Sequence, residues 1–174
     1  MEEIADTGGI NFPYDYWHLI SIYGEEDKVF LTSSNIKKLK DIGLGRYASL
    51  NFWDITDKDL SGIQERFPNA KLFNEPHAQV VIELLDKIQK EEKDSYLIVH
   101  CAAGISRSGA IGTFACDYCH LDYHEFTKSN PSIMANQYVL ATIRKISGMT
   151  PTFENHDGIA PVNIINGIIV PAPK

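Results

Sequence analysis

The segment YLIVHCAAGISRSG, residues 96–109, decides the expected fold. It opens with an apolar run of the kind that forms a short buried strand. A small, Gly-containing loop follows, which we call the cradle loop (residues 101–107), with Cys101 at its start and Arg107 at its end. A helix is predicted to begin near residues 105–108, so that backbone N–H groups and the positive end of the helix face a common centre. We therefore expect an anion to bind there.

The two ends of the cradle loop carry complementary chemistry. The positive potential of such a loop lowers the pKa of a thiol, so Cys101 is expected to be a thiolate near neutral pH. Arg107 offers a planar fork of N–H donors to two oxygens of a phosphoryl group. The alternative, in which Cys101 is a buried structural cysteine, leaves Arg107 unexplained.

These residues fit the pattern His-Cys-x5-Arg-Ser/Thr, from His100 to Ser108. In this the chain resembles the cysteine-dependent protein tyrosine phosphatase superfamily, and the sequence of residues 103–109 is most similar to its dual-specificity branch. The resemblance implies a metal-independent phosphomonoester hydrolase that forms a phosphocysteine intermediate and needs no cofactor. Cys101 would be the nucleophile, Arg107 would hold the phosphoryl oxygens, and Ser108 would donate to the sulfur as it leaves.

The other residues of the motif receive supporting roles. His100 is expected to support the cradle loop structurally and not to act as an acid or base. Phosphate is expected to be bound by the loop residues Ala102, Ala103, Gly104, Ile105, Ser106 and Arg107. No metal site is predicted.

A carboxylic acid should protonate the oxygen that leaves the substrate. Asp54 is the first choice, because it follows an apolar strand and Trp53, in a segment that resembles the one carrying the acid in this family. Asp57 and Asp59 lie just beyond it and remain open as alternatives.

The pattern along the chain predicts an α/β fold, with a central, mostly parallel sheet flanked by helices, like that of the protein tyrosine phosphatases. Strands are expected at residues 19–23, 47–52 and 96–100, with a weaker one at 28–31. Helices are expected at 74–90, where Asn74 can cap the first turn, after the cradle loop, and at about 133–147.

Composition agrees with one phosphatase domain over residues 1–174, of which 1–17 and 149–174 have no assigned element. The 174 residues are 44% hydrophobic, and the formal net charge of −7 argues against nucleic acid or a membrane surface as a partner. The three cysteines suggest no disulfide framework, and the first residues do not resemble a signal peptide, so a cytoplasmic protein is expected.

Several other interpretations fit the sequence less well. Cys116, Cys119 and His120 have the spacing of a haem-attachment motif, and with His124 they offer zinc ligands, but packing on a helix explains them better. A rhodanese-type loop is typically one residue shorter. Low-molecular-weight phosphatases and related arsenate reductases carry their motif close to the N-terminus, unlike Cys101.

The expected partner is a phosphorylated protein, with phosphate, sulfate or vanadate as ligands of the loop. Residues 102–106 contain no Lys or Arg, which disfavours an inositol phosphate or an RNA 5′-phosphate. Phosphotyrosine is favoured, with phosphoserine and phosphothreonine left open. The alternatives are a phosphate-binding module without turnover and a phosphatase that acts on a non-protein phosphate such as a phosphoinositide or an RNA 5′-phosphate. The aromatic residues Phe12, Tyr14, Tyr16 and Trp17 either wall the pocket or, as we favour, join the core.

Overall fold

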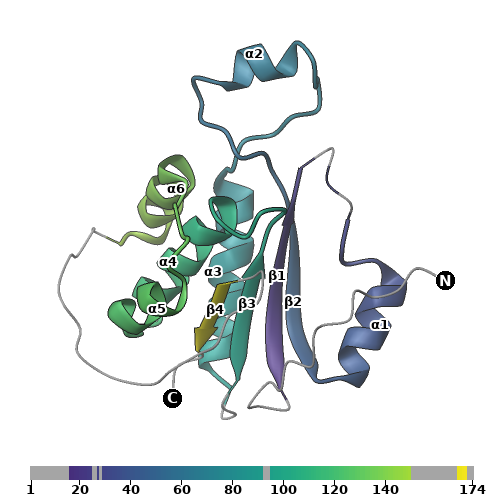
Figure 1. Cartoon of the computed structure of the whole chain (residues 1–174), viewed down its shortest axis with the longest axis vertical. Coiled ribbons are helices and arrows are strands. Elements are labelled where there is room, and N and C mark those ends of the chain that lie inside the picture. Colours follow the sequence, from purple (N-terminus) through teal and green to yellow (C-terminus); the bar gives the residue numbers. More distant parts are fainter. Residues whose placement is uncertain (1–15, 25–26, 28, 92–94, 150–167, 172–174) are drawn as a thin grey trace.

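The computed structural model describes residues 16–24, 27, 29–91, 95–149 and 168–171. Strands and helices alternate over most of this length (Figure 1). In chain order they are β1 (Trp17–Tyr23), α1 (Ser33–Asp41), β2 (Leu44–Asn51), α2 (Leu60–Gln64), α3 (Glu75–Gln89), β3 (Tyr96–His100), α4 (Arg107–Tyr118), α5 (Tyr123–Ser129), α6 (Gln137–Ser147) and β4 (Ile168–Pro171).

The strands form one sheet in the order β2-β1-β3-β4. The first three are parallel, and Ile20 of β1 lies between Ala48 of β2 and Val99 of β3. β4 pairs with β3 in the antiparallel direction, with Ile168 opposite Val99. The expected α/β fold with a mostly parallel sheet is therefore confirmed.

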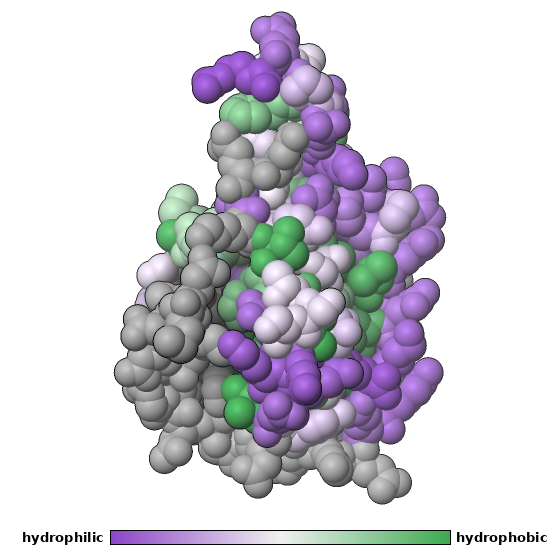
Figure 2. Space-filling view, turned by 90° about the vertical axis from the view of Figure 1, so that its right-hand side faces the viewer, coloured by the Kyte–Doolittle hydropathy of each residue, from purple (hydrophilic) through white to green (hydrophobic). Residues whose placement is uncertain are grey.

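Both faces of the sheet are covered by helices, as a parallel sheet requires. Trp17 and Leu19 of β1 pack on the α1 side, whereas Ile20 and Ile22 join the larger core formed with α3, α4 and α6. β1 and β3 are consequently mostly buried, whereas β2, at the edge of the sheet, also carries exposed residues such as Arg46 and Ser49. Outside this core, the side of the molecule that carries α1 is largely hydrophilic, with only separate apolar groups on it (Figure 2).

The order of the strands places a crevice between the ends of β1 and β3. The chain leaves β1 through α1 to reach β2 on one side, and then passes through α3 to reach β3 on the other. Where the connections from two neighbouring parallel strands lead to opposite sides of the sheet, the loops at their carboxyl ends leave room for a ligand. Here those loops contain Gly24 and Asp27 after β1, and the cradle loop after β3.

Local signals explain the helix that leads into β3. Asn74 accepts a hydrogen bond from the N–H of His77, His77 Nδ1 accepts one from the N–H of Asn74, and Pro76 lies in the first turn. Such a reciprocal cap satisfies donors that the first turn of a helix leaves unpaired. The predicted helix at 74–90 is confirmed as α3.

Other elements differ from the prediction. The last helix begins at Gln137 and not at Ile133, because Asn136 caps it and residues 133–136 run along the cradle loop instead. Residues 29–31 form no strand, and Val29 and Phe30 are exposed. β4 was not predicted.

The N-terminal aromatic group is described only in part. Trp17 is buried in β1, and its Nε1 donates to the carbonyl oxygen of Ile42 at 3.1 Å, so this residue belongs to the core as expected. Phe12 and Tyr14 lie outside the described residues. None of the helices in the described part of the chain is long and apolar enough to cross a membrane.

Candidate active site

The cradle loop curls around the sulfur of Cys101. Backbone N–H groups of Gly104, Ile105 and Ser108 are hydrogen-bonded to this sulfur. Gly104 has a φ of 68°, a left-handed conformation that a side chain would strain. Glycine at this position therefore lets the loop turn its N–H groups inward.

The environment of Cys101 favours the thiolate. Its side chain is almost fully buried, and burial alone would raise its pKa. Hydrogen bonds from the Ser108 hydroxyl, 3.2 Å from the sulfur, and from the three N–H groups outweigh burial and lower the pKa of Cys101 below its usual value. Cys101 and Ser108 are thus brought together as their expected roles require.

The other two cysteines lie in a different environment. Cys116 and Cys119 are buried in and just after α4, and burial raises the pKa of both thiols, that of Cys119 to about 12. Cys116 Sγ donates to the carbonyl oxygen of Leu121 at 3.5 Å. Among the described residues, Cys116, Cys119, His120 and His124 form no group of metal ligands. Core packing accounts for both cysteines.

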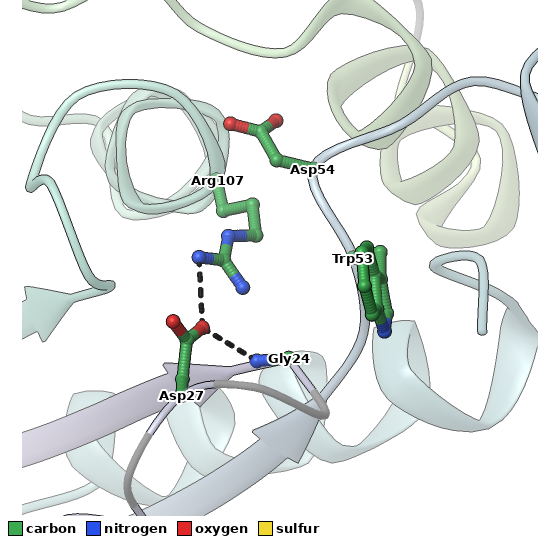
Figure 3. Close-up of a pocket in the computed structure, with 5 residues that line it drawn as sticks. All are labelled: Gly24, Asp27, Trp53, Asp54 and Arg107. Carbon is green, nitrogen blue, oxygen red and sulfur yellow. Dashed lines mark hydrogen bonds and ion pairs between the residues drawn. The ribbon is translucent and has the colours of Figure 1, made fainter. Parts of the chain in front are cut away.

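Arg107 is the first residue of α4, and its guanidinium reaches the segments that follow β1 and β2. Nη1 donates to the carbonyl oxygen of Phe52 at 3.0 Å, and Nη2 donates to Oδ2 of Asp27 at 3.1 Å (Figure 3). Nε is buried and has no partner among the described residues. The guanidinium is therefore held in place while Nε–H and part of its fork remain available to an anion.

Asp27 was not singled out from the sequence. Its Oδ2 also accepts from the N–H of Gly24 at 2.6 Å. Partial burial would raise the pKa of Asp27, but the hydrogen bonds from Gly24 and Arg107 and the positive charge of Arg107 lower it overall, so the group is ionised. The only sequence feature that could have indicated Asp27 was its position just after the first strand. Loops that follow strands at the point where the strand order reverses line the ligand-binding crevice.

Asp54 lies across the same pocket. The pocket has a volume of about 200 Å³ and is lined by Gly24, Asp27, Trp53, Asp54 and Arg107. Figure 3 shows the Asp27 and Asp54 carboxylates on opposite sides of the Arg107 guanidinium. Asp54 Oδ1 accepts a hydrogen bond from Ser106 Oγ at 2.7 Å and another from Asn136 Nδ2 at 2.8 Å. The expected acid and the expected phosphate-binding arginine thus share one site.

Residues 70–146 match the family model described as protein-tyrosine phosphatase. Over these residues, which make up less than half of the chain, the sequence is similar to that family. The match includes α3, β3, the cradle loop and α4, whereas Asp27 and Asp54 precede it. Comparisons with curated proteins and with solved structures gave no match.

The two alternative acids, Asp57 and Asp59, lie outside this pocket. Asp59 Oδ2 accepts from the N–H and Oγ1 of Thr56, at 3.0 and 2.7 Å, and these hydrogen bonds lower the pKa of Asp59. Asp57 is exposed, and neither residue lines the pocket. Both belong to residues 53–73, which project beyond the sheet and carry α2 (Figure 1).

The base of that projection forms one wall of the pocket that Arg107 and Asp54 line. The N–H of Trp53 donates to the carbonyl oxygen of Lys71 at 2.8 Å, which closes the segment on itself. The Trp53 ring packs on Phe67 with centroids 4.8 Å apart. Trp53 is therefore a fixed aromatic wall beside Asp54.

His100, which precedes the cradle loop, is held by packing. Its ring lies edge-on to Phe30 with centroids 5.0 Å apart, and burial lowers its pKa. Nε2 is buried without a partner among the described residues. Its predicted support of the cradle loop remains a prediction.

Proposed function

We propose that this protein hydrolyses phosphomonoesters of proteins through a phosphocysteine intermediate, with Cys101, Arg107, Asp54 and Ser108 as catalytic residues. The observation that carries the proposal is the Cys101 sulfur, which accepts hydrogen bonds from the N–H groups of Gly104 and Ile105 in the cradle loop and of Ser108 in α4, and lies beside the Ser108 hydroxyl. The same groups and Arg107 are suited to the oxygens of a phosphoryl group, over which charge is spread in the transition state.

In the first step, the Cys101 thiolate attacks phosphorus. A bond from sulfur to phosphorus forms while the bond from phosphorus to the ester oxygen breaks. Asp54 gives its proton to that oxygen, which departs as an alcohol or a phenol. The negative charge of the thiolate is thereby passed to the Asp54 carboxylate.

In the second step, the Asp54 carboxylate takes a proton from water, and the water oxygen attacks phosphorus. The bond between phosphorus and sulfur breaks, its electron pair returns to Cys101, and inorganic phosphate is formed. Ser108 Oγ, 3.2 Å from the sulfur, donates to the thiolate as it leaves. One carboxyl group serves as acid and then as base.

Charge and shape favour a single phosphate on an aromatic side chain. Within the pocket, one guanidinium is accompanied by two carboxylates, Asp27 and Asp54, so that a molecule with several phosphates would be repelled. The Trp53 wall suits the flat ring of phosphotyrosine. We propose phosphotyrosine proteins as the main substrates, with phosphoserine and phosphothreonine as possible further substrates of a dual-specificity enzyme.

The phosphatase domain is proposed to occupy the whole chain. The observation that supports this extent is β4, because residues 168–171 extend the sheet beside the strand that leads to Cys101.

The proposal is tested with an aryl phosphate in the presence of a metal chelator. Wild-type protein should turn over, because the cradle loop and Arg107 supply the positive charge that a metal would otherwise provide. Rapid acid quench should trap phosphate on Cys101, and Cys101→Ser should abolish turnover while vanadate still binds. Wild-type protein that binds vanadate without turnover would instead identify a phosphate-binding module. Matched phosphotyrosine and phosphothreonine peptides then rank the substrates.

A further inference from the structure

The Asp54 carboxylate is held by two donors that reach the same oxygen. Ser106 Oγ, from the cradle loop, donates to Oδ1 at 2.7 Å, and Asn136 Nδ2, from the start of α6, donates to Oδ1 at 2.8 Å. No hydrogen bond to Oδ2 is recorded from the described residues. The two oxygens of the carboxyl group thus have different surroundings.

The orientation of Asn136 follows from its other hydrogen bonds. Its Oδ1 accepts from the N–H of Val139 at 3.1 Å, which caps α6. The side-chain oxygen is therefore committed to the helix, and the NH2 group must face Asp54. The reversed amide would set two oxygens against each other on the Asp54 side.

The position of Asn136 is set by the cradle loop itself. The N–H of Asn136 donates to the carbonyl oxygen of Ser106 at 3.1 Å. The N–H of Met134 donates to the carbonyl oxygen of Ile105 at 3.3 Å. Gly109 allows this approach, because a Cβ there would lie only 3.1 Å from the Ile133 side chain. Asn136 and the cradle loop are consequently parts of one frame.

These contacts determine which oxygen of Asp54 can carry a proton. Each carboxyl oxygen has about two lone-pair sites, and the two donors fill both sites of Oδ1. A proton on Asp54 must then be on Oδ2. A general acid works only when its proton is aligned with the leaving oxygen, and an error of about 1 Å can cost about 100-fold in rate.

We propose that Asn136 and Ser106 are positioning residues for the Asp54 acid: they hold Oδ1 as an acceptor and leave Oδ2 to transfer the proton. This inference rests on the proposed role of Asp54. It links the acid to the cradle loop, so that the nucleophile and the acid are set in one geometry.

The test compares a poor leaving group, phenyl phosphate, with a good one, 2,4-dinitrophenyl phosphate. The variants are Asn136→Ser and Ser106→Ala. Serine keeps an acceptor for the cap of α6, but its shorter side chain lacks the NH2 group that reaches Asp54. Each variant should lower kcat for phenyl phosphate by about 10- to 100-fold, with less than about 3-fold change for the good leaving group, because only the poor one needs the aligned proton.

Two further variants separate positioning from general stability. Thr32→Ala removes the cap of α1, does not alter a residue that lines the pocket, and should leave the ratio of the two rates unchanged. Ser106→Thr keeps the hydroxyl and should restore most of the rate. If Asn136→Ser does not fold, Asn136→Asp also preserves the cap while replacing the donor with an acceptor, and it should show the same selective loss.

The decisive measurement repeats Asn136→Ser and Ser106→Ala in an Asp54→Asn background. There they should cause no further selective loss, because the acid they position is already absent. Equal losses on both substrates, or a selective loss that persists in this background, would overturn the inference. If Asp54→Asn alone does not lower kcat for phenyl phosphate more than for 2,4-dinitrophenyl phosphate, the assignment of Asp54 has failed instead.

Discussion

Arg107 Nη2 donates to Asp27 Oδ2 at 3.1 Å, across a separation of 80 positions in the sequence. Together with the bond from Nη1 to the carbonyl oxygen of Phe52, this contact fixes the plane of the guanidinium. A long side chain that is already ordered loses less conformational entropy when it binds an anion. The contact with Asp27 thus prepares Arg107 for the phosphoryl group.

Arg107→Lys should be strongly impaired, because an ammonium group cannot bond Phe52 and Asp27 and also present a planar fork. We expect kcat/KM for an aryl phosphate to fall by at least about 100-fold, the usual effect of losing a donor to the reacting group. Arg46→Lys is the matched control, since Arg46 pairs with Glu91 on the surface. Comparable activity of Arg107→Lys and wild type would contradict the role of the fork.

Iodoacetate should alkylate Cys101 alone at neutral pH. The hydrogen bonds in the cradle loop lower the pKa of Cys101, whereas burial raises the pKa values of Cys116 and Cys119, so only Cys101 supplies thiolate there. Peptide mass mapping identifies the modified site. Phosphate should protect Cys101, and modification of Cys116 or Cys119 at a similar rate would count against a specially activated thiol.

Asp54→Asn should slow phenyl phosphate hydrolysis by about 10²- to 10⁴-fold, the usual contribution of a general acid, and should affect good leaving groups much less. Steady-state rates over a series of substituted phenyl phosphates measure this difference.

Asp57→Asn and Asp59→Asn are the matched controls, and both should retain the wild-type dependence on the leaving group. A selective loss in either control, with none in Asp54→Asn, would move the acid to that position and leave the nucleophile unchanged.

Gly109→Val should lower both stability and turnover. Its side chain would meet Ile133 and the backbone of Ala135, and overpacking of this kind costs about 1–3 kcal/mol of unfolding free energy. Displacement of residues 133–136 would also carry Asn136 away from Asp54. Gly62→Ala, in open space on α2, should instead leave activity unchanged and stability equal or slightly higher. Urea unfolding and kcat on phenyl phosphate measure both effects.

The free energy of unfolding should fall as the pH drops below about 6.5, the usual pKa of histidine. Burial lowers the pKa of His18 in the folded protein, where its Nδ1 accepts from the N–H of Arg46. Between the folded and unfolded pKa values, the unfolded chain therefore binds one more proton, and stability declines with falling pH by up to about 1.4 kcal/mol per unit.

This pH dependence is measured by urea unfolding between pH 5 and 7.5. His18→Gln should reduce the slope, although the half-buried His77 and His100 contribute in the same direction. His124→Gln, at an exposed position, is the control. An unchanged slope in His18→Gln would show that this histidine does not remain neutral in the fold.

Local sequence signals predicted the elements that depend on near neighbours. The strand, loop and helix from 96 to 118 follow from an apolar run, a glycine and helical spacing, and α3 follows from Asn74 and Pro76. The cradle loop, in which Cys101 lies in contact with Ser108, could be predicted for the same reason.

Features that depend on distant contacts were not predicted. Ile133 has helical spacing with α6, yet it packs against Gly109, and the cap at Asn136 starts the helix later. Asp27 reaches Arg107 only after the sheet has formed. A four-residue apolar segment such as β4 cannot be assigned by periodicity, because its pairing with β3 is what makes it a strand.

That pairing has a practical consequence for handling the protein. Because β4 lies against one side of β3 and β1 against the other, the strand that carries the nucleophile has no free edge over residues 96–99. A truncation before Ile168 would bare a row of unsatisfied amides and carbonyls on an apolar strand, which is a template for intermolecular sheet formation. We therefore expect affinity tags or proteolytic trimming at the C-terminus to lower solubility before they lower catalytic activity.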